Sequence, residues 1–205
     1  MALKKSSVSR RNFLKTAGAL SAGSFLSPLE SLAATQMASD TKESKSIVVP
    51  TRPFCKTGEK VSILTLGGHG GHLSSLILHQ AVKWGVTFWD LWDTDRSMGG
   101  GISQRSVGEY FNKYPNTRKK VFLMTKTDDH KPKALTKFLN KALLEMNTNT
   151  IDFFVIHSVS NIGTLNSETY AWADMAKKEG KIRYFGVSSH SRMEKVMTGA
   201  VELGW

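Results

Sequence analysis

The sequence predicts an α/β fold built from parallel strands. Short apolar runs recur from residue 61 to residue 187, and amphipathic segments with apolar residues at helical spacing lie between them. Polar residues follow three consecutive runs, which is typical of the carboxyl ends of parallel strands. Because each crossover between parallel strands must return over a face of the sheet, this alternation favours either a doubly wound sheet or part of a (β/α)8 barrel.

The elements can be placed in order from these patterns. The strands are predicted at 61–66, 86–91, 121–125, 151–156 and 182–187. The helices are predicted from apolar faces at Leu73, Ile77, Ala81 and Trp84; at Val107, Tyr110, Phe111 and Tyr114; at Leu135, Phe138, Leu139, Ala142, Leu143 and Met146; at Trp172, Met175 and Ala176; and at Met193, Val196, Met197, Ala200 and Val201. Ser103 and Ser191 are candidate N-caps, and Gly180 and Gly204 are candidate helix ends. The segment 47–60 is expected to form a short hairpin that turns at Thr57 and Gly58.

The glycine-rich segment 67–71 follows the first predicted strand. It lacks the G-x-G-x-x-G spacing of a Rossmann fold and the Lys-Ser/Thr pair of a P-loop. A Rossmann domain is therefore disfavoured. Gly67 and Gly68 are instead expected to let the backbone turn and approach a ligand.

The composition narrows the class of protein. A chain of 205 residues can form one domain with a sizeable core. The formal net charge is +11, but no aromatic residues interleave with the basic segments, so we interpret them as solvated surface and expect no nucleic-acid partner. The single cysteine, Cys55, excludes an internal disulfide. No apolar run is long enough for a permanent membrane span.

The N-terminus resembles an export signal. The string S-R-R-N-F-L-K at residues 9–15 precedes an apolar stretch at 16–26 and small residues at 31–34. Its paired arginines resemble a twin-arginine (Tat) signal, which is read by a receptor. We therefore expect a Tat-type signal peptide at 1–33, a polar linker at 34–46 and a folded domain at 47–205, exported by the Tat machinery to the periplasm.

Three polar residues stand at the ends of consecutive predicted strands. Asp90, Lys126 and His157 each follow an apolar run directly. The interior of a parallel barrel or sheet is apolar, so a polar side chain at a strand's carboxyl end is expected to point at a ligand-binding face. A carboxylate, an ammonium and an imidazole on three successive strands therefore predict a site.

Segments from residue 47 to the C-terminus resemble the aldo/keto reductase family. The opening is similar in V-P-T-R-P at 49–53, K-T-G-E-K-V-S at 56–62 and L-G-G at 66–68. The four later matches are G-V-T-F-W-D at 85–90, V-F-L-M-T-K at 121–126, I-D-F-F-V-I-H at 151–157 and G-K-I-R-Y-F-G-V-S at 180–188. The resemblance implies a partial (β/α)8 barrel of about five βα units preceded by a short hairpin. It also implies an oxidoreductase that uses NADPH, or NADH in its place, to reduce a small aldehyde or ketone.

The resemblance assigns catalytic roles by motif position. In the family a tyrosine donates a proton to the carbonyl oxygen, a lysine lowers the pKa of that tyrosine, an aspartate holds the lysine, and a histidine orients the carbonyl. Lys126 stands at the position of the lysine that lowers the pKa, and Asp90 stands at the position of the aspartate that holds it. His157 stands at the position of the histidine that orients the carbonyl.

The resemblance also implies a set of cofactor-binding residues. Ser188 would contact the nicotinamide amide, and Ser189 stands where the family usually has asparagine. Gly67, Gly68 and Asp90 would line the same cofactor site.

Two departures from the family pattern affect the functional prediction. The tyrosine position, five residues after Asp90, holds Asp95, which is ionised at neutral pH unless its pKa is strongly raised. The chain also stops at Trp205, where a sixth strand would begin, so a truncated member is expected. The alternative hypothesis is a non-catalytic barrel fragment that needs a complementing chain or serves as a binding module.

A metal site is a third interpretation of the histidines near the first strand. His69 and His72 are three residues apart, and His79 lies further on. No cysteine or carboxylate cluster joins them, so no metal is predicted.

Overall fold

The structure, a computed structural model, describes residues 48–69, 71–92 and 102–204. Five parallel strands form one sheet in the order β3-β4-β5-β6-β7, preceded by the antiparallel hairpin β1–β2. The strands are β1 Thr51–Pro53, β2 Lys60–Ser62, β3 Thr65–His69, β4 Phe88–Trp92, β5 Phe122–Thr127, β6 Ile151–Ile156 and β7 Ile182–Val187. Each sheet strand pairs with the next one along the chain, as successive βα units of a barrel do. The predicted α/β fold with an N-terminal hairpin is confirmed.

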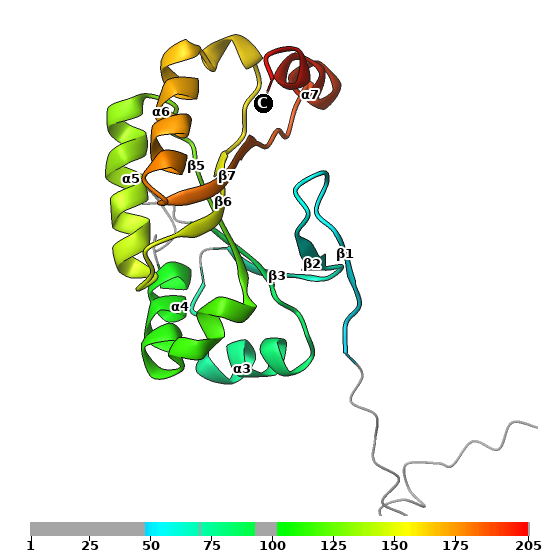
Figure 1. Cartoon of the computed structure of the whole chain (residues 1–205), viewed down its shortest axis with the longest axis vertical. Helices are drawn as coiled ribbons and strands as arrows, with labels where there is room; N and C mark the ends of the chain where they lie inside the picture. The colour runs from blue at the N-terminus through cyan, green and yellow to red at the C-terminus, as the bar shows by residue number, and fades with distance from the viewer. Residues whose placement is uncertain (1–47, 70, 93–101, 205) are drawn as a thin grey trace, which may run out of the picture. The chain divides into compact units, whose positions relative to one another are not determined.

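Helices follow the strands and cover the sheet. Figure 1 shows α4, α5 and α6 ranged along one side of the strands. The helices are α3 Ser75–Lys83, α4 Ile102–Lys113, α5 Pro132–Glu145, α6 Ser167–Lys178 and α7 Met193–Glu202, with short 3-10 helices η1 Pro115–Lys120 and η2 Ile162–Thr164. Local chemistry fixes several ends: Ser74 caps α3, Asn166 caps α6, and α5 starts with Pro132 in its first turn.

The apolar core lies between the sheet and the helices. Trp89 of β4 stacks on Phe111 of α4 with ring centroids 5.7 Å apart, and Phe154 of β6 packs against Trp172 of α6 at 5.5 Å. All four side chains are buried. Burying such large apolar side chains is the main driving force for docking the helices on the sheet.

A second aromatic cluster closes the other face of the sheet at the amino ends of the strands. Phe54, in the hairpin loop, lies 5.0 Å from Phe122 and 5.3 Å from Phe153 between ring centroids. Phe88 and Tyr184 complete the cluster around it. We call these five rings the aromatic floor. It holds the predicted N-terminal hairpin against the barrel interior.

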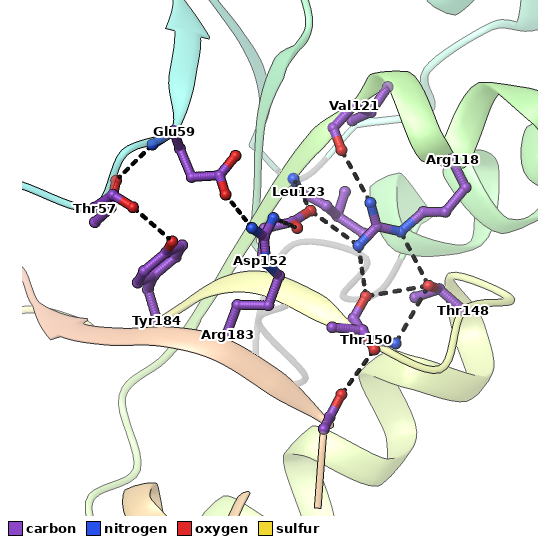
Figure 2. A network of polar contacts seen from close by, with 11 residues as sticks. Thr57, Glu59, Arg118, Val121, Leu123, Thr148, Thr150, Asp152, Arg183 and Tyr184 are labelled. Carbon is purple, nitrogen blue, oxygen red and sulfur yellow. Dashed lines mark hydrogen bonds and ion pairs between the residues drawn. The ribbon is translucent and has the colours of Figure 1, made fainter. Parts of the chain in front are cut away.

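A polar network ties the same end of the molecule together (Figure 2). The buried carboxylate of Asp152 accepts from the backbone N–H of Leu123 at 2.8 Å and pairs with Arg118 at 2.9 Å and Arg183 at 2.8 Å. Arg183 also pairs with Glu59 in the hairpin loop. The network therefore joins the hairpin, β5, β6 and β7 through one buried negative charge.

The single strand predicted at 61–66 is two strands. Ser62 ends β2, and its hydroxyl donates to the carbonyl of Leu64 at 2.6 Å. The same oxygen accepts from the backbone N–H groups of Thr87 at 3.0 Å and Phe88 at 2.9 Å. These contacts bend the chain, so residues 60–62 pair with β1 while residues 65–69 begin the parallel sheet.

Some predicted helix faces and caps are wrong. In α3 the buried side chains are Leu78 and the predicted Ala81, while the predicted Ile77 and Trp84 are exposed. Ser103 lies inside α4, and its hydroxyl donates to the carbonyl of Trp92 at 3.3 Å. The N-cap of α7 is Arg192 rather than Ser191. For Ser103 a tertiary contact replaces the predicted cap, and the start of α7 differs from the predicted one by a single residue.

Candidate active site

Side-chain alternation along β4 and β5 separates a core face from a site face. Trp89 and Leu91 point to the helices and are buried, whereas Asp90 and Trp92 lie on the other face of the same strand. On β5 the alternation puts Lys126 on that face too. The strands are parallel and in register, so their carboxyl ends meet at one rim above the aromatic floor.

Asp90 and Lys126 form an ion pair at this rim. Lys126 Nζ donates to both carboxylate oxygens of Asp90 at 2.7 Å. The Lys126 side chain is 16% exposed and that of Asp90 is 27% exposed, so solvent screens the pair only in part. A carboxylate held by two charge-assisted contacts fixes the position of the ammonium group.

His157 stands just beyond the end of β6, and neighbouring strands fix its backbone and ring. Its backbone N–H donates to the carbonyl of Thr127 at 2.7 Å, and its Nδ1 lies 2.7 Å from Ser188 Oγ. The Trp92 ring packs against the imidazole with centroids 5.1 Å apart. The other ring nitrogen, Nε2, lies 3.2 Å from Nε2 of His190.

The surroundings favour the neutral form of His157. Burial is the largest cause that lowers its pKa, and the positive charge of Lys126 lowers it further. Asp128 and Asp90 act in the opposite direction. These interactions place His157 within electrostatic reach of the Asp90–Lys126 pair.

The four other residues predicted to line the cofactor site have different surroundings. A Cβ at Gly67 would meet no atom within 4 Å, whereas one at Gly68 would lie 2.7 Å from Leu91 Cδ2 in the core. Gly68 is therefore explained by packing against the core. Ser188 Oγ bonds His157, while Ser189 Oγ donates to the carbonyl of Ser191 at 2.5 Å.

The comparisons with known proteins identify the family. The family model for aldo/keto reductases matches residues 74–202. The chain belongs to the aldo/keto reductase family. A second model, for the TAT (twin-arginine translocation) pathway signal sequence, matches residues 7–27 and indicates export across the membrane. Among curated proteins, no match was found.

Solved structures of aldo-keto reductases share the fold. The holo form of one from Bacillus halodurans superposes with a TM-score of 0.65 at 21% identity, over 75% of this chain and 54% of that one. A thermostable aldo-keto reductase in complex with the inhibitor epalrestat gives a TM-score of 0.58 at 24% identity, over 73% of this chain and 58% of that one. The chain thus spans little more than half the length of these barrels, which confirms the predicted partial barrel.

The position of the family tyrosine falls outside the described residues. Asp95 lies within 93–101, which the structure does not describe. Tyr110, the first tyrosine after Asp90, belongs to the core: it is 3% exposed and packs against Trp89 with centroids 6.1 Å apart. Burial raises the pKa of Tyr110, which makes it a poorer acid.

Two of the three histidines considered for a metal site, His72 and His79, have separate partners. His72 Nδ1 lies 3.0 Å from Ser106 Oγ, and His79 Nδ1 lies 3.5 Å from the Tyr110 hydroxyl. Within residues 48–69, 71–92 and 102–204, no cluster of three metal-ligating side chains is present.

In the same ranges, none of the helices combines the length and apolar character needed to cross a membrane.

Sequence reasoning missed three residues around His157. Trp92 shares a strand face with Asp90, two positions earlier, so period-two alternation could have indicated it. His190 follows Ser188 at the same spacing in the loop after β7, and Asp128 follows Lys126 after β5. These two lie beyond the strand ends, where periodicity no longer gives direction.

Proposed function

We propose that this aldo/keto reductase chain carries the nicotinamide end of the active site of an NADPH-dependent reductase of aldehydes or ketones, with NADH as the alternative cofactor. The observation that supports this most directly is the Asp90–Lys126 ion pair beside His157 on consecutive strands of the sheet. The residues at the rim suit a nicotinamide. The hydroxyl of Ser188 can donate to or accept from its amide, and the backbone at Gly67 leaves room for close approach.

The side chains have complementary tasks in this reaction. When bound, the reduced nicotinamide supplies the hydride that adds to the carbonyl carbon. Negative charge then grows on the carbonyl oxygen, and the fixed ammonium of Lys126 stabilises it electrostatically. Asp90 holds that ammonium in place, and the neutral imidazole of His157 orients the carbonyl.

The alternative function is cofactor or partner binding without turnover. It is favoured by Asp95 at the tyrosine position, because an ionised carboxylate has no proton to donate. In the described part of the chain, β3 and β7 each pair on one side only, so each has an edge at which a complementing chain could add a strand. The Tat signal supports export of the folded domain, and we propose the periplasm as its destination.

Fluorescence titration of NADPH and NADH into the full chain, followed by assay with small aldehydes and ketones, tests the proposal. Saturable binding with turnover is expected for the reductase, and Lys126→Met should lower kcat by about 10²- to 10³-fold. Lys133→Met, an exposed lysine of α5, is the matched control and should leave kcat unchanged. Binding without turnover would support the alternative, and absence of saturable binding at millimolar cofactor would refute the reductase.

The variant Asp95→Tyr tests the assignment of the tyrosine position. A phenol has an ordinary pKa of about 10, and the Lys126 ammonium would lower that pKa so that the phenol could act as an acid. Carbonyl reduction should therefore increase in this variant. Unchanged turnover, with NADPH binding retained, would show that residue 95 does not stand at the tyrosine position.

A further inference from the structure

The loop after β7 places a second imidazole against His157. We propose that His190 is a positioning residue of the active site, which holds a proton against Nε2 of His157 and relays protons between solvent and the substrate carbonyl. The inference deepens the proposed reductase function and rests on it. No role for His190 follows from the motif positions discussed above.

The geometry of the two rings is that of a hydrogen-bonded pair. Their Nε2 atoms are 3.2 Å apart, and the rings stand nearly perpendicular, at 88°, with centroids 4.9 Å apart. Two imidazole nitrogens at this distance share one proton, because two facing lone pairs would repel. His190 therefore occupies the nitrogen of His157 that its contact with Ser188 leaves available.

The backbone around His190 is held on both sides. The N–H of Ser188 donates to Ile156 at 2.9 Å, and the carbonyl of Ser188 accepts from Val159 at 2.8 Å. On the other side, Ser189 Oγ donates to the carbonyl of Ser191 at 2.5 Å and accepts from its N–H at 3.3 Å. The turn made by these contacts presents the imidazole of His190, which lies between Ser189 and Ser191, toward β6. His190 is thus aimed at His157 by a fixed backbone.

The two histidines differ in their exposure to solvent. His157 is half-buried beside the Asp90–Lys126 pair, whereas His190 is exposed. The groups that face His157 are Lys126 and His190, which disfavour its charged form, and Asp128 and Asp90, which favour it. These surroundings disfavour a positive charge on His157 in the free site, and negative charge that develops on a carbonyl oxygen there would favour it.

The proton balance of reduction can be met by this pair. As hydride from the reduced nicotinamide forms the new C–H bond, the C–O π electrons become a lone pair on oxygen. A substrate carbonyl would take the place of His190 beside Nε2 of His157. If His157 then carries the positive charge, its Nε2 proton passes to that oxygen: an N–H bond breaks, an O–H bond forms, the ring becomes neutral, and the new hydroxyl donates back to Nε2. Solvent at His190 then restores the proton. The relay thus supplies a proton that an ionised Asp95 would lack.

Histidine-labelled NMR of the full chain tests the pairing without any turnover. The imidazole signals of His157 are followed through its titration in the wild type, in His190→Gln and in the control His130→Gln, which removes an exposed histidine after β5. In His190→Gln the pKa of His157 should rise toward its ordinary 6.5, because a positive charge that opposes protonation is gone. In the control, the pKa of His157 should stay where it is in the wild type.

The same samples separate this inference from the proposed function. An unchanged titration of His157 in His190→Gln, or absence of a ring-to-ring nuclear Overhauser contact in the wild type, would overturn the pairing. In reduction assays His190→Gln should lower kcat by roughly 10- to 100-fold and leave the KM for NADPH unchanged. A fall in kcat of this size is no larger than the usual contribution of a general acid. An intact pairing in a chain that binds no NADPH would refute the reductase function while supporting the ring contact alone.

Discussion

Asp90, Lys126 and His157 come together because each lies at the carboxyl end of a strand and the three strands are consecutive in one parallel sheet. Neighbouring parallel strands bring equivalent positions side by side, so residues far apart in sequence reach one rim. The 2.7 Å contacts between Lys126 and Asp90 follow from that register and from the alternation that turns both side chains off the core face. The chemistry at the rim is thus set by strand ends.

The lowered pKa of His157 predicts a pH dependence of stability. Its folded-state pKa lies below the ordinary 6.5, so the unfolded chain binds this proton more readily than the folded chain. The associated stability is fully present above pH 6.5 and is lost as the pH falls through the interval between 6.5 and the folded-state pKa. In urea unfolding at a series of pH values, the wild type should therefore lose more stability on acidification than His157→Gln does. Equal losses would show that His157 titrates alike in the two states.

Residues of the site that lie at strand ends can be predicted from the sequence, whereas residues in the loops cannot. Strand ends are readable from apolar runs, so the positions of Asp90, Lys126 and His157 on the fold could be predicted. The contact between His157 and His190 depends on a turn held by hydrogen bonds at Ser188 and Ser189, and no periodicity encodes such a turn. Residues in loops after the strands were therefore missed.

Elements were predicted best where one buried face dominates. The bounds of β6 and β7 agree with the predicted runs, since those strands lie in the middle of an apolar pattern flanked by turns. The stretch 61–66 is mostly apolar, but the hydroxyl of Ser62 binds backbone groups at the start of β4 and divides it. Only tertiary contacts reveal that break.

The crossing of α4 and α5 makes a prediction at the level of elements. A Cβ on Gly108 of α4 would overlap the backbone carbonyl of Glu145 at the end of α5. Gly108→Ala should therefore lower the free energy of unfolding by about 1–3 kcal/mol, the typical cost of overpacking. Urea denaturation followed by circular dichroism measures this.

Gly67→Ala is the matched control, because a Cβ there meets no atom within 4 Å. It should change stability little yet weaken NADPH binding, since it places a methyl group where the cofactor would approach. A stability loss in Gly67→Ala as large as that in Gly108→Ala would contradict the close contact between α4 and α5 at Gly108 and the open space at Gly67.

At the scale of the whole domain, the two ends of the strands serve different purposes. The amino ends hold the aromatic floor, which joins the hairpin to β4, β5, β6 and β7. They also hold the Asp152 network, which joins the hairpin to the last three of these strands (Figure 2). The carboxyl ends carry the Asp90–Lys126 pair and His157. This separation of stability from chemistry is the general plan of parallel barrels.

The network at the amino ends predicts a large effect of one substitution. Asp152 is almost fully buried and compensates Arg118 and Arg183, so Asp152→Asn leaves two guanidinium groups facing each other without the charge between them. We expect a loss of about 3 kcal/mol in the free energy of unfolding. Asp174→Asn, in an exposed pair with Lys177 on α6, is the control and should cost less than about 1 kcal/mol. Equal effects of the two changes would contradict a central role for the buried carboxylate.

The central claim is that the carboxyl rim around Lys126 and His157 receives the nicotinamide. Its most direct test is to add NADPH to the histidine-labelled full chain and record which imidazole signals move. We predict saturable shifts of His157, with His79 on α3 and His130 after β5 unaffected. Saturable binding that leaves His157 unmoved, or no binding at millimolar NADPH, would contradict the claim.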